Sequence, residues 1–387
     1  QPQRRRQDVE LNIEFGFGAG QVVEIETLRV AEDIAGLALA QSQRIHLDFS
    51  RTREADLGAA LLISVITTEA RRITSISCSS LLHLSDDSIS LLRAVEFPFA
   101  DGESKLSLLV RGQSVVKSAT KSSGHERAIG VMAGLLHSIG RLHDAQLDDD
   151  YIEQIGNLCG EALENAQRHS GTREWWLAVH FIPQRLATTC GTLHISMMNF
   201  GATFHETLSA LPEAAQTRKE IERLLMHHRA QNVLTDSSTE LLWTLLALQE
   251  GISCKDIEPV RSQAQGNGLP QLITGFQNVA LGSSPGFERN LPRERREARR
   301  QERRDRRLDL RIVTGSTAIR INDKYYMTKQ RTPFGRTVEV IAFNSRNNLW
   351  HPPLRDGIFS IQERMHGTLI TMYFCVPCRQ SSNDYPG

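Results

Sequence analysis

Strand patterns and helix patterns alternate along residues 9–110 of this 387-residue chain. In the strand patterns apolar and polar side chains take turns, as they do when one face of a strand is buried. In the helix patterns apolar side chains recur every three or four residues. Such alternation predicts a small α/β layer domain, which we place at residues 1–113. The predicted strands are 9–15, 44–49, 73–78 and 105–110, and the predicted helices are 26–40, 56–72 and 86–95.

A stretch rich in Ser, Lys and Thr at residues 114–124 separates this unit from the rest of the chain. It lacks apolar periodicity, so we interpret it as a linker. Residues 125–387 again mix helix and strand patterns and form a second predicted domain. With 40% hydrophobic residues, a chain of this length can build two ordinary globular cores. The predicted fold class is therefore α/β with two domains.

One helical stretch of the second domain, residues 150–169, carries a polar stripe beside its apolar one. Glu161, Asn165 and His169 stand four residues apart and therefore share one face of the helix. A carboxylate can polarise water, an amide oxygen can bind a hard cation, and an imidazole can contact phosphate. The stripe suits a nucleotide-binding helix, although a solvent-facing polar face would show the same spacing.

Three later segments combine glycine with residues that could contact a nucleotide. After a strand, a polar side chain can read the edge of a base, and a Gly that follows it lets the backbone approach the nucleotide closely. Before a helix, Gly-x-Gly offers free amides and the positive helix end to phosphate. The segments are Asn199-Phe200-Gly201 after the predicted strand 192–198, Gly266-Asn267-Gly268-Leu269 before a predicted helix at 271–276, and Gly367-Thr368 at the start of the strand 367–374.

These segments, in this order, resemble the GHKL superfamily of ATPases and kinases, most closely its anti-sigma-factor-kinase-like branch. The resemblance covers residues 125–376, and its strongest match is the first box, which runs from Glu161 to His169. It implies a two-layer α/β sandwich with a mixed sheet and a lid over the nucleotide at about 202–265. It also implies ATP and Mg²⁺ as cofactors.

The resemblance implies a role for each motif residue. Glu161 would be the catalytic residue that orients or deprotonates the attacking water or hydroxyl, and Asn165 would ligate Mg²⁺. Where the family has an Asp that accepts from the adenine amino group, Asn199 keeps the acceptor oxygen but not the charge. Thr203 stands where a second Gly is common. The implied nucleotide-binding residues are Asn165, His169, Asn199, Gly201, Gly266, Gly268, Leu269 and Thr368.

The N-terminal unit resembles a STAS domain, the fold of anti-sigma factor antagonists. The similar residues are Leu47-Asp48-Phe49-Ser50, the turn ending at Asp56, and the apolar helix after it. Members switched by phosphorylation carry a Ser directly after that Asp, whereas Leu57 stands here. The resemblance therefore implies a module that docks a protein partner, and a purely structural α/β domain stays as the alternative.

The charge balance and the cysteines limit which partners and which cellular location we expect. Lys+Arg and Asp+Glu are equal at 45 each, so no net field draws the whole chain to nucleic acid. Residues 288–307 interleave Arg with Glu and predict an exposed helical insertion, for which nucleic-acid contact is not favoured. Six scattered cysteines predict free thiols, including Cys375 and Cys378, and a cytoplasmic location. No apolar run has spanning length, so we expect no membrane partner.

Together these features predict an intracellular, Mg²⁺-dependent ATP-binding protein that hydrolyses ATP or transfers its phosphate to a protein partner. Glu161 favours chemistry, because binding alone would not need a carboxylate one turn before the metal ligand. The changed residues Asn199 and Thr203 favour the alternative, a non-catalytic regulatory module in which nucleotide closes the lid and alters docking.

Overall fold

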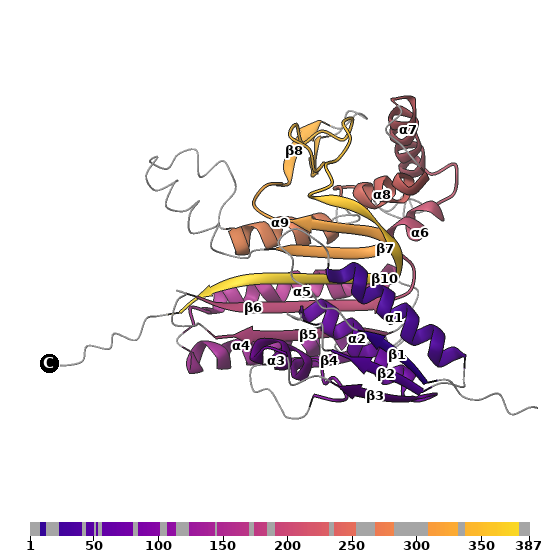
Figure 1. Ribbon diagram of the computed structural model, residues 1–387. Coiled ribbons are helices and arrows are strands. Elements are labelled where there is room, and N and C mark those ends of the chain that lie inside the picture. Colours follow the sequence, from indigo (N-terminus) through magenta and orange to yellow (C-terminus); the bar gives the residue numbers. More distant parts are fainter. Residues whose placement is uncertain are drawn as a thin grey trace, which may run out of the picture.

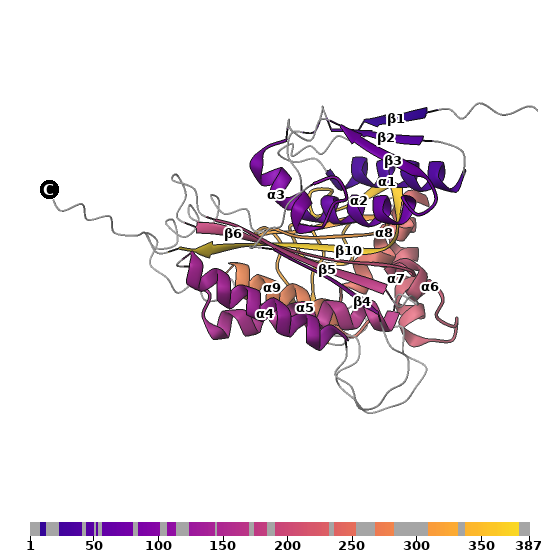
Figure 2. The same ribbon diagram turned by 90° about the horizontal axis from the view of Figure 1, so that it is seen from below.

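A computed structural model describes residues 8–12, 23–40, 44–49, 52, 56–79, 84–100, 107–113, 124–143, 145–169, 174–183, 190–231, 236–252, 268–281, 309–331 and 337–378. Helices and strands alternate through most of this range and build a mixed α/β fold (Figure 1). Two larger sheets and two groups of helices stack on one another as four layers (Figure 2).

A five-stranded sheet with the order β4-β5-β6-β10-β7 forms the centre of the fold. Every neighbouring pair of its strands is antiparallel, so the prediction of a mixed sheet is wrong for the described strands. The strand predicted at 105–110 corresponds to β4, which pairs with β5 and not with the N-terminal strands. The strands are β4 (Ser107–Gln113), β5 (Glu174–Ile182), β6 (Cys190–Phe200), β10 (Ile358–Pro377) and β7 (Leu310–Ile321).

Three helices cover one face of this sheet (Figure 2): α4 (Gly124–Leu142), α5 (Asp149–His169) and α9 (Gly268–Leu281). Successive side chains of a strand point to opposite faces, so only alternate residues reach these helices. The residues that share a core with them include Leu177 of β5, Ile195 of β6, Ile370 of β10 and Ile312 of β7. This parity defines what we call the α5 face of the sheet.

The opposite face is covered by α1 (Val23–Leu39), α2 (Leu57–Ala70) and α3 (Asp86–Ala94). Strand residues of the other parity, such as Trp176 and Met198, share a second core with these helices. On their far side lies a parallel sheet of β1 (Asp8–Asn12), β2 (Arg44–Asp48) and β3 (Ser75–Ser79). The N-terminal helices are therefore enclosed between two sheets, which explains why α2 is apolar over most of its surface.

Smaller elements follow the end of β6 and lie together at one end of the molecule (Figure 1). They are α6 (Phe204–Ser209), α7 (Gln216–Ala230) and α8 (Asp236–Ala247), in the region predicted as the lid. A two-stranded sheet of β8 (Thr328–Arg331) and β9 (Thr337–Val340) completes the fold. The lid residues 253–265, the linker residues 114–123 and the Arg-rich segment 288–307 lie outside the described residues.

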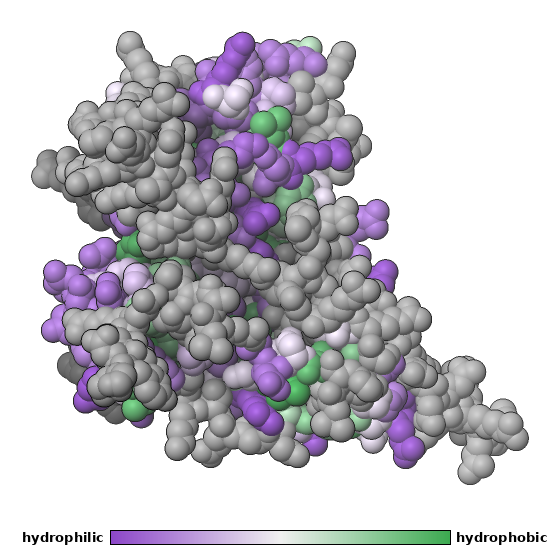
Figure 3. All heavy atoms as spheres, turned by 60° about the vertical axis from the view of Figure 1, so that its left-hand side comes forward, coloured by the Kyte–Doolittle hydropathy of each residue, from purple (hydrophilic) through white to green (hydrophobic). Residues whose placement is uncertain are grey.

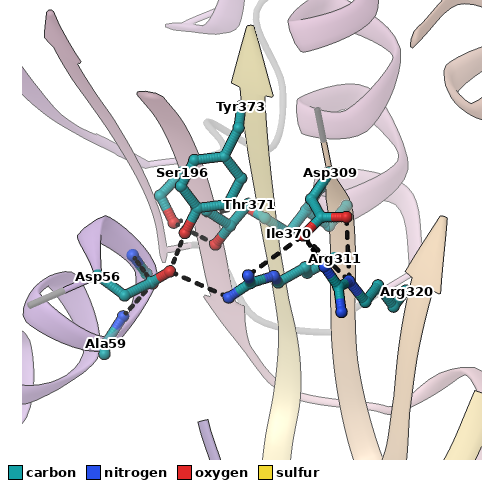
Figure 4. Close-up of polar contacts among 10 residues, drawn as sticks. Asp56, Ala59, Ser196, Asp309, Arg311, Arg320, Ile370, Thr371 and Tyr373 are labelled. Carbon is teal, nitrogen blue, oxygen red and sulfur yellow. Dashed lines mark hydrogen bonds and ion pairs between the residues drawn. The ribbon is translucent and has the colours of Figure 1, made fainter. Parts of the chain in front are cut away.

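A buried polar contact fastens the N-terminal helices to the central sheet (Figure 4). Asp56 caps α2 by accepting from the backbone N–H groups of Gly58 and Ala59 at 2.7 and 3.1 Å. Its other oxygen accepts from Arg311 Nη1 on β7 at 3.3 Å and from the hydroxyl of Tyr373 on β10. Burial raises the pKa of the Asp56 carboxyl, and Arg311 opposes that shift. The Asp predicted at the helix start is thus a cap and an anchor.

The cysteines depart from the prediction at one position. Cys375 on β10 is disulfide-bonded, whereas Cys78, Cys159 and Cys378 are free thiols. The expectation of free thiols is therefore wrong for Cys375, and Cys375 and Cys378 are not joined to each other. Because structural disulfides are rare in reducing compartments, the cysteines no longer support the predicted cytoplasmic location.

Among the described residues, no helix combines the length and the apolar character needed to cross a lipid bilayer. On the face shown in Figure 3, hydrophilic side chains dominate the coloured surface and apolar ones form small separate patches. The large apolar side chains that are exposed come from different elements, among them Leu39, Leu142 and Met226. Such scattered residues are normal for a protein surface.

Candidate functional site

The polar stripe of α5 is present where the sequence predicts it. Glu161 and Asn165 are both half-buried and lie one turn apart on the same side of the helix. His169 is the last residue of α5, and its side chain lies outside the described residues. The apolar residues of α5, such as Ile155 and Leu163, point into the core below the helix. The stripe therefore borders the core without belonging to it.

The start of α9 lies against Asn165. A β-carbon at position 268 would come within 2.6 Å of Asn165 Oδ1 and 2.7 Å of its Cγ, so only glycine leaves room for the amide there. Gly268 is the first residue of α9, which begins earlier than the helix predicted from 271. Leu269 packs beside the core, and Gly266 lies outside the described residues. Two predicted motifs, more than a hundred residues apart, thus meet side by side.

A row of side chains crosses the sheet on the α5 face. Trp175 of β5 pairs with Asn199 of β6, Asn199 pairs with Thr368 of β10, and Thr368 pairs with Thr314 of β7. Directly opposite residues on antiparallel strands project to the same side. Each of the four lies an even number of positions along its strand from a residue that packs under α5, so its side chain points to the same face. Thr368 Oγ1 donates to Thr314 Oγ1 at 3.3 Å, which confirms that these two side chains share a face.

Two glycines allow the backbone to turn at the end of this row. Gly201, directly after β6, has a φ of 134°, and its N–H donates to the carbonyl of His366 at 3.2 Å. Gly367, directly before Thr368, has a φ of 136°, and a β-carbon there would come within 2.7 Å of Phe200 Cα. L-residues with side chains rarely adopt such angles. Gly201 is therefore required by its backbone angle, and Gly367 by its angle and by the close approach of β6 and β10.

Threonine at position 203 is explained by the start of the next helix. It is the N-cap of α6: its hydroxyl accepts from Glu206 N at 3.1 Å, while Glu206 accepts from Thr203 N at 2.9 Å. This reciprocal capping box fixes the first helix after β6. Thr203 is buried, and the next residue, Phe204, donates its N–H to Thr314 Oγ1 at 3.4 Å. The row across the sheet and the start of α6 are thus connected.

Arg364 on β10 joins α6 and α8 to the N-terminal unit. Its guanidinium donates to Glu206 of α6 at 2.9 Å and to Glu240 of α8 at 3.1 Å. Its backbone N–H donates to Glu32 of α1 at 3.2 Å. The Thr203 N–H and the neighbouring Arg364 hold the pKa of Glu206 below its usual range. Arg364 therefore links α6 and α8 through its side chain and α1 through its backbone.

The residues on α5 fit a magnesium ion that arrives with a nucleotide. Within the described part of the chain, no group of three His, Cys, Asp or Glu side chains could hold a metal alone. Mg²⁺ in nucleotide sites usually takes one or two protein oxygens and completes its shell with phosphate oxygens and water. Asn165 offers an amide oxygen beside the α9 terminus, and its buried Nδ2 has no hydrogen-bond partner among the described residues.

Two residues of this row, Trp175 and Thr314, belong to none of the motifs found in the sequence. Their place in the row follows only from strand pairing, which joins positions distant in the sequence. One sequence signal points to Trp175: it lies at the start of the strand that directly follows the motif helix, so a short connection returns the chain to the site.

Comparison of the chain with family models, with curated proteins and with solved structures found no match.

Proposed function

We propose that this chain binds ATP with Mg²⁺ between α5, the start of α9 and the row of residues on the α5 face, in the manner of the GHKL proteins that it resembles. The observation that carries the proposal is the contact between Asn165 and Gly268. Chance similarity of two short motifs would not place them side by side. A helix N-terminus next to an amide oxygen suits a phosphate with its cation.

In this proposal each group has a distinct task. Asn165 would hold Mg²⁺, which when bound offsets the charge of the phosphate oxygens. Free backbone amides at the start of α9 would donate to phosphate. Glu161, one turn before Asn165, would accept the proton of an attacking water or protein hydroxyl, which makes the chain an ATPase or a protein kinase. Asn199 and Thr368 would contact the base.

Calorimetric titration with ATP and Mg²⁺ tests binding. We expect wild type to bind and Asn165→Ala to bind at least tenfold more weakly, because the cation loses its protein ligand. Asn157→Ala is the matched control, since Asn157 is exposed on α5, about two turns earlier. No binding by wild type, or equal binding by the two variants, refutes the proposal.

Phosphate release then tests turnover. Glu161→Ala should reduce the rate by about 10²-fold or more if Glu161 acts as the base. Glu153→Ala, an exposed change on the same helix, should leave the rate unaltered. If wild type binds ATP but releases no phosphate, transfer of radiolabelled phosphate to candidate proteins separates a kinase from a regulator.

A second candidate is a nucleotide-gated interaction module without turnover. Arg364 favours it, because this residue ties α6 and α8 to α1 of the N-terminal unit. Nucleotide that reorganises the lid helices would then also disturb the contact with Glu32. Hydrogen exchange of α1 with and without nucleotide checks this, using Glu161→Ala to remove turnover; unchanged exchange argues against it.

The parallel sheet gives the N-terminal unit an outer face on which a protein partner could dock. α1, α2 and α3 are enclosed between the parallel sheet and the five-stranded sheet (Figure 2). Docking through the STAS-like unit is therefore proposed for the far side of the parallel sheet, where His46 and Asp48 of β2 are half-buried. Pull-down with His46→Glu as the variant would test it, because a negative charge on this face should abolish capture.

A further inference from the structure

Trp175 carries a buried donor that has no acceptor among the described residues. The side chain is 1% exposed, and within the described residues its indole Nε1–H has no hydrogen-bond partner. Indole nitrogen can only donate, so no rearrangement of its own proton relieves this. Most buried polar groups in folded proteins are paired, and an exception calls for an unseen water, ion or ligand. Other buried atoms of the described residues also have no partner, so the position of Trp175 beside the proposed site is what marks this donor as a ligand contact.

The neighbours of Trp175 indicate which kind of molecule this is. Asn199 is its direct partner on β6, and Thr368 follows on β10, both on the α5 face. Residue 175 also lies just after the connection that follows α5, so its strand begins close to the helix end that bears Asn165. The buried Nδ2 of Asn165 likewise has no hydrogen-bond partner within the described part of the chain. Both unpaired donors border the proposed nucleotide site.

We propose that the indole N–H of Trp175 donates to a ring nitrogen of a purine base, an inference that rests on the proposed nucleotide-binding function. The unprotonated ring nitrogens of adenine are acceptors, as a donor-only group requires. Asn199 beside it can accept from the exocyclic amino group. Because an amide can rotate to present either its oxygen or its nitrogen, Asn199 alone reads the base ambiguously. Trp175 supplies the fixed donor, so it selects bases that present an unprotonated ring nitrogen at this point.

The neighbouring tryptophan provides a matched control. Trp176 is also buried, at 5% exposure, but it belongs to the opposite core and contacts Phe200 with ring centroids 5.6 Å apart. Trp175→Phe keeps an aromatic ring and removes the N–H. Trp176→Phe makes the same chemical change on the face turned to the N-terminal helices. Both variants are made in the full chain, and their thermal unfolding is recorded beside wild type.

ATP with Mg²⁺ is titrated into wild type and both variants. We expect Trp175→Phe to weaken binding about tenfold and Trp176→Phe to leave it unchanged. The change in tryptophan emission on ATP addition should persist in Trp176→Phe and be smaller in Trp175→Phe. Equal affinity of wild type and Trp175→Phe overturns the inference while leaving nucleotide binding intact. Failure of wild type to bind overturns the proposed function as well.

Analogues of ATP identify the acceptor atom. Wild type is titrated with the 1-deaza, 3-deaza and 7-deaza forms, each of which replaces one ring nitrogen by carbon. One of them should bind about tenfold more weakly than ATP, and that deficit should vanish in Trp175→Phe. Should Trp175→Phe fail to fold, the wild-type series still decides, because equal affinity for all three analogues contradicts the inference.

Discussion

Gly268 leaves the space that the side chain of Asn165 occupies. Any β-carbon there would collide with the Asn165 amide. Gly268→Ala is expected to displace Asn165 and to weaken binding of ATP with Mg²⁺ by at least tenfold while the fold persists, as calorimetry and circular dichroism would show. Gly160→Ala on α5 is the control, because nothing lies within 4 Å of a β-carbon there. Unimpaired binding by Gly268→Ala would argue against the site.

His180 makes folding depend on pH. Burial lowers its pKa to about 4 from 6.5, and the side chain is 1% exposed. Between these values the unfolded chain binds more protons than the folded one, so stability falls as pH falls through this window. The loss is about 3 kcal/mol.

The His180→Gln variant isolates this effect. Gln keeps a polar partner for Ser107, whose hydroxyl lies 2.7 Å from His180 Nδ1, but it does not titrate. Urea unfolding at pH 6.5 and pH 4 should show a loss about 3 kcal/mol smaller in His180→Gln than in wild type. His366→Gln, an exposed change on β10, should behave as wild type. Equal losses in all three proteins would exclude His180 as the cause.

At the scale of elements, α5 and α9 approach closely through glycine. A β-carbon at Gly275 would overlap Leu158 Cδ2, two turns of each helix away from the Gly268–Asn165 contact. Gly275→Ala should cost about 1–3 kcal/mol of unfolding free energy because Leu158 must move. The double variant Gly275→Ala/Leu158→Ala should lose less unfolding free energy than the sum of the two single losses, by about 0.5 kcal/mol or more. Additive values from denaturant unfolding would show that the two residues do not interact.

At the scale of the whole molecule, Asp56 couples the N-terminal layers to the central sheet. The carboxyl is 1% exposed and meets Arg311 and Tyr373, which come from two strands of that sheet. Removing one member of a buried charged pair usually costs about 3–5 kcal/mol, so Asp56→Ala should be destabilised by that amount. Asp33→Ala, an exposed change on α1, should stay within about 0.5 kcal/mol of wild type.

The same contact predicts that the layers unfold together. Hydrogen exchange under mild denaturant should show amides of β2 and of β10 opening in one transition in wild type. In Asp56→Ala the N-terminal amides should open at lower denaturant than those of β10. Separate opening already in wild type would mean that the N-terminal unit is an independent domain.

The sequence by itself determined the α/β class, most helices and strands, the polar stripe of α5 and the glycine at the start of α9, whereas the contact between Asn165 and Gly268 is a tertiary one. Helical periodicity and glycine at a helix start are local properties, so neighbours in the chain suffice to predict them. The tertiary structure decided that β4 joins the central sheet, that the N-terminal helices lie between two sheets, and that Trp175 and Thr314 flank Asn199 and Thr368. Strand pairing brings positions such as 199 and 368 together, and no local pattern encodes which distant strand will be the neighbour.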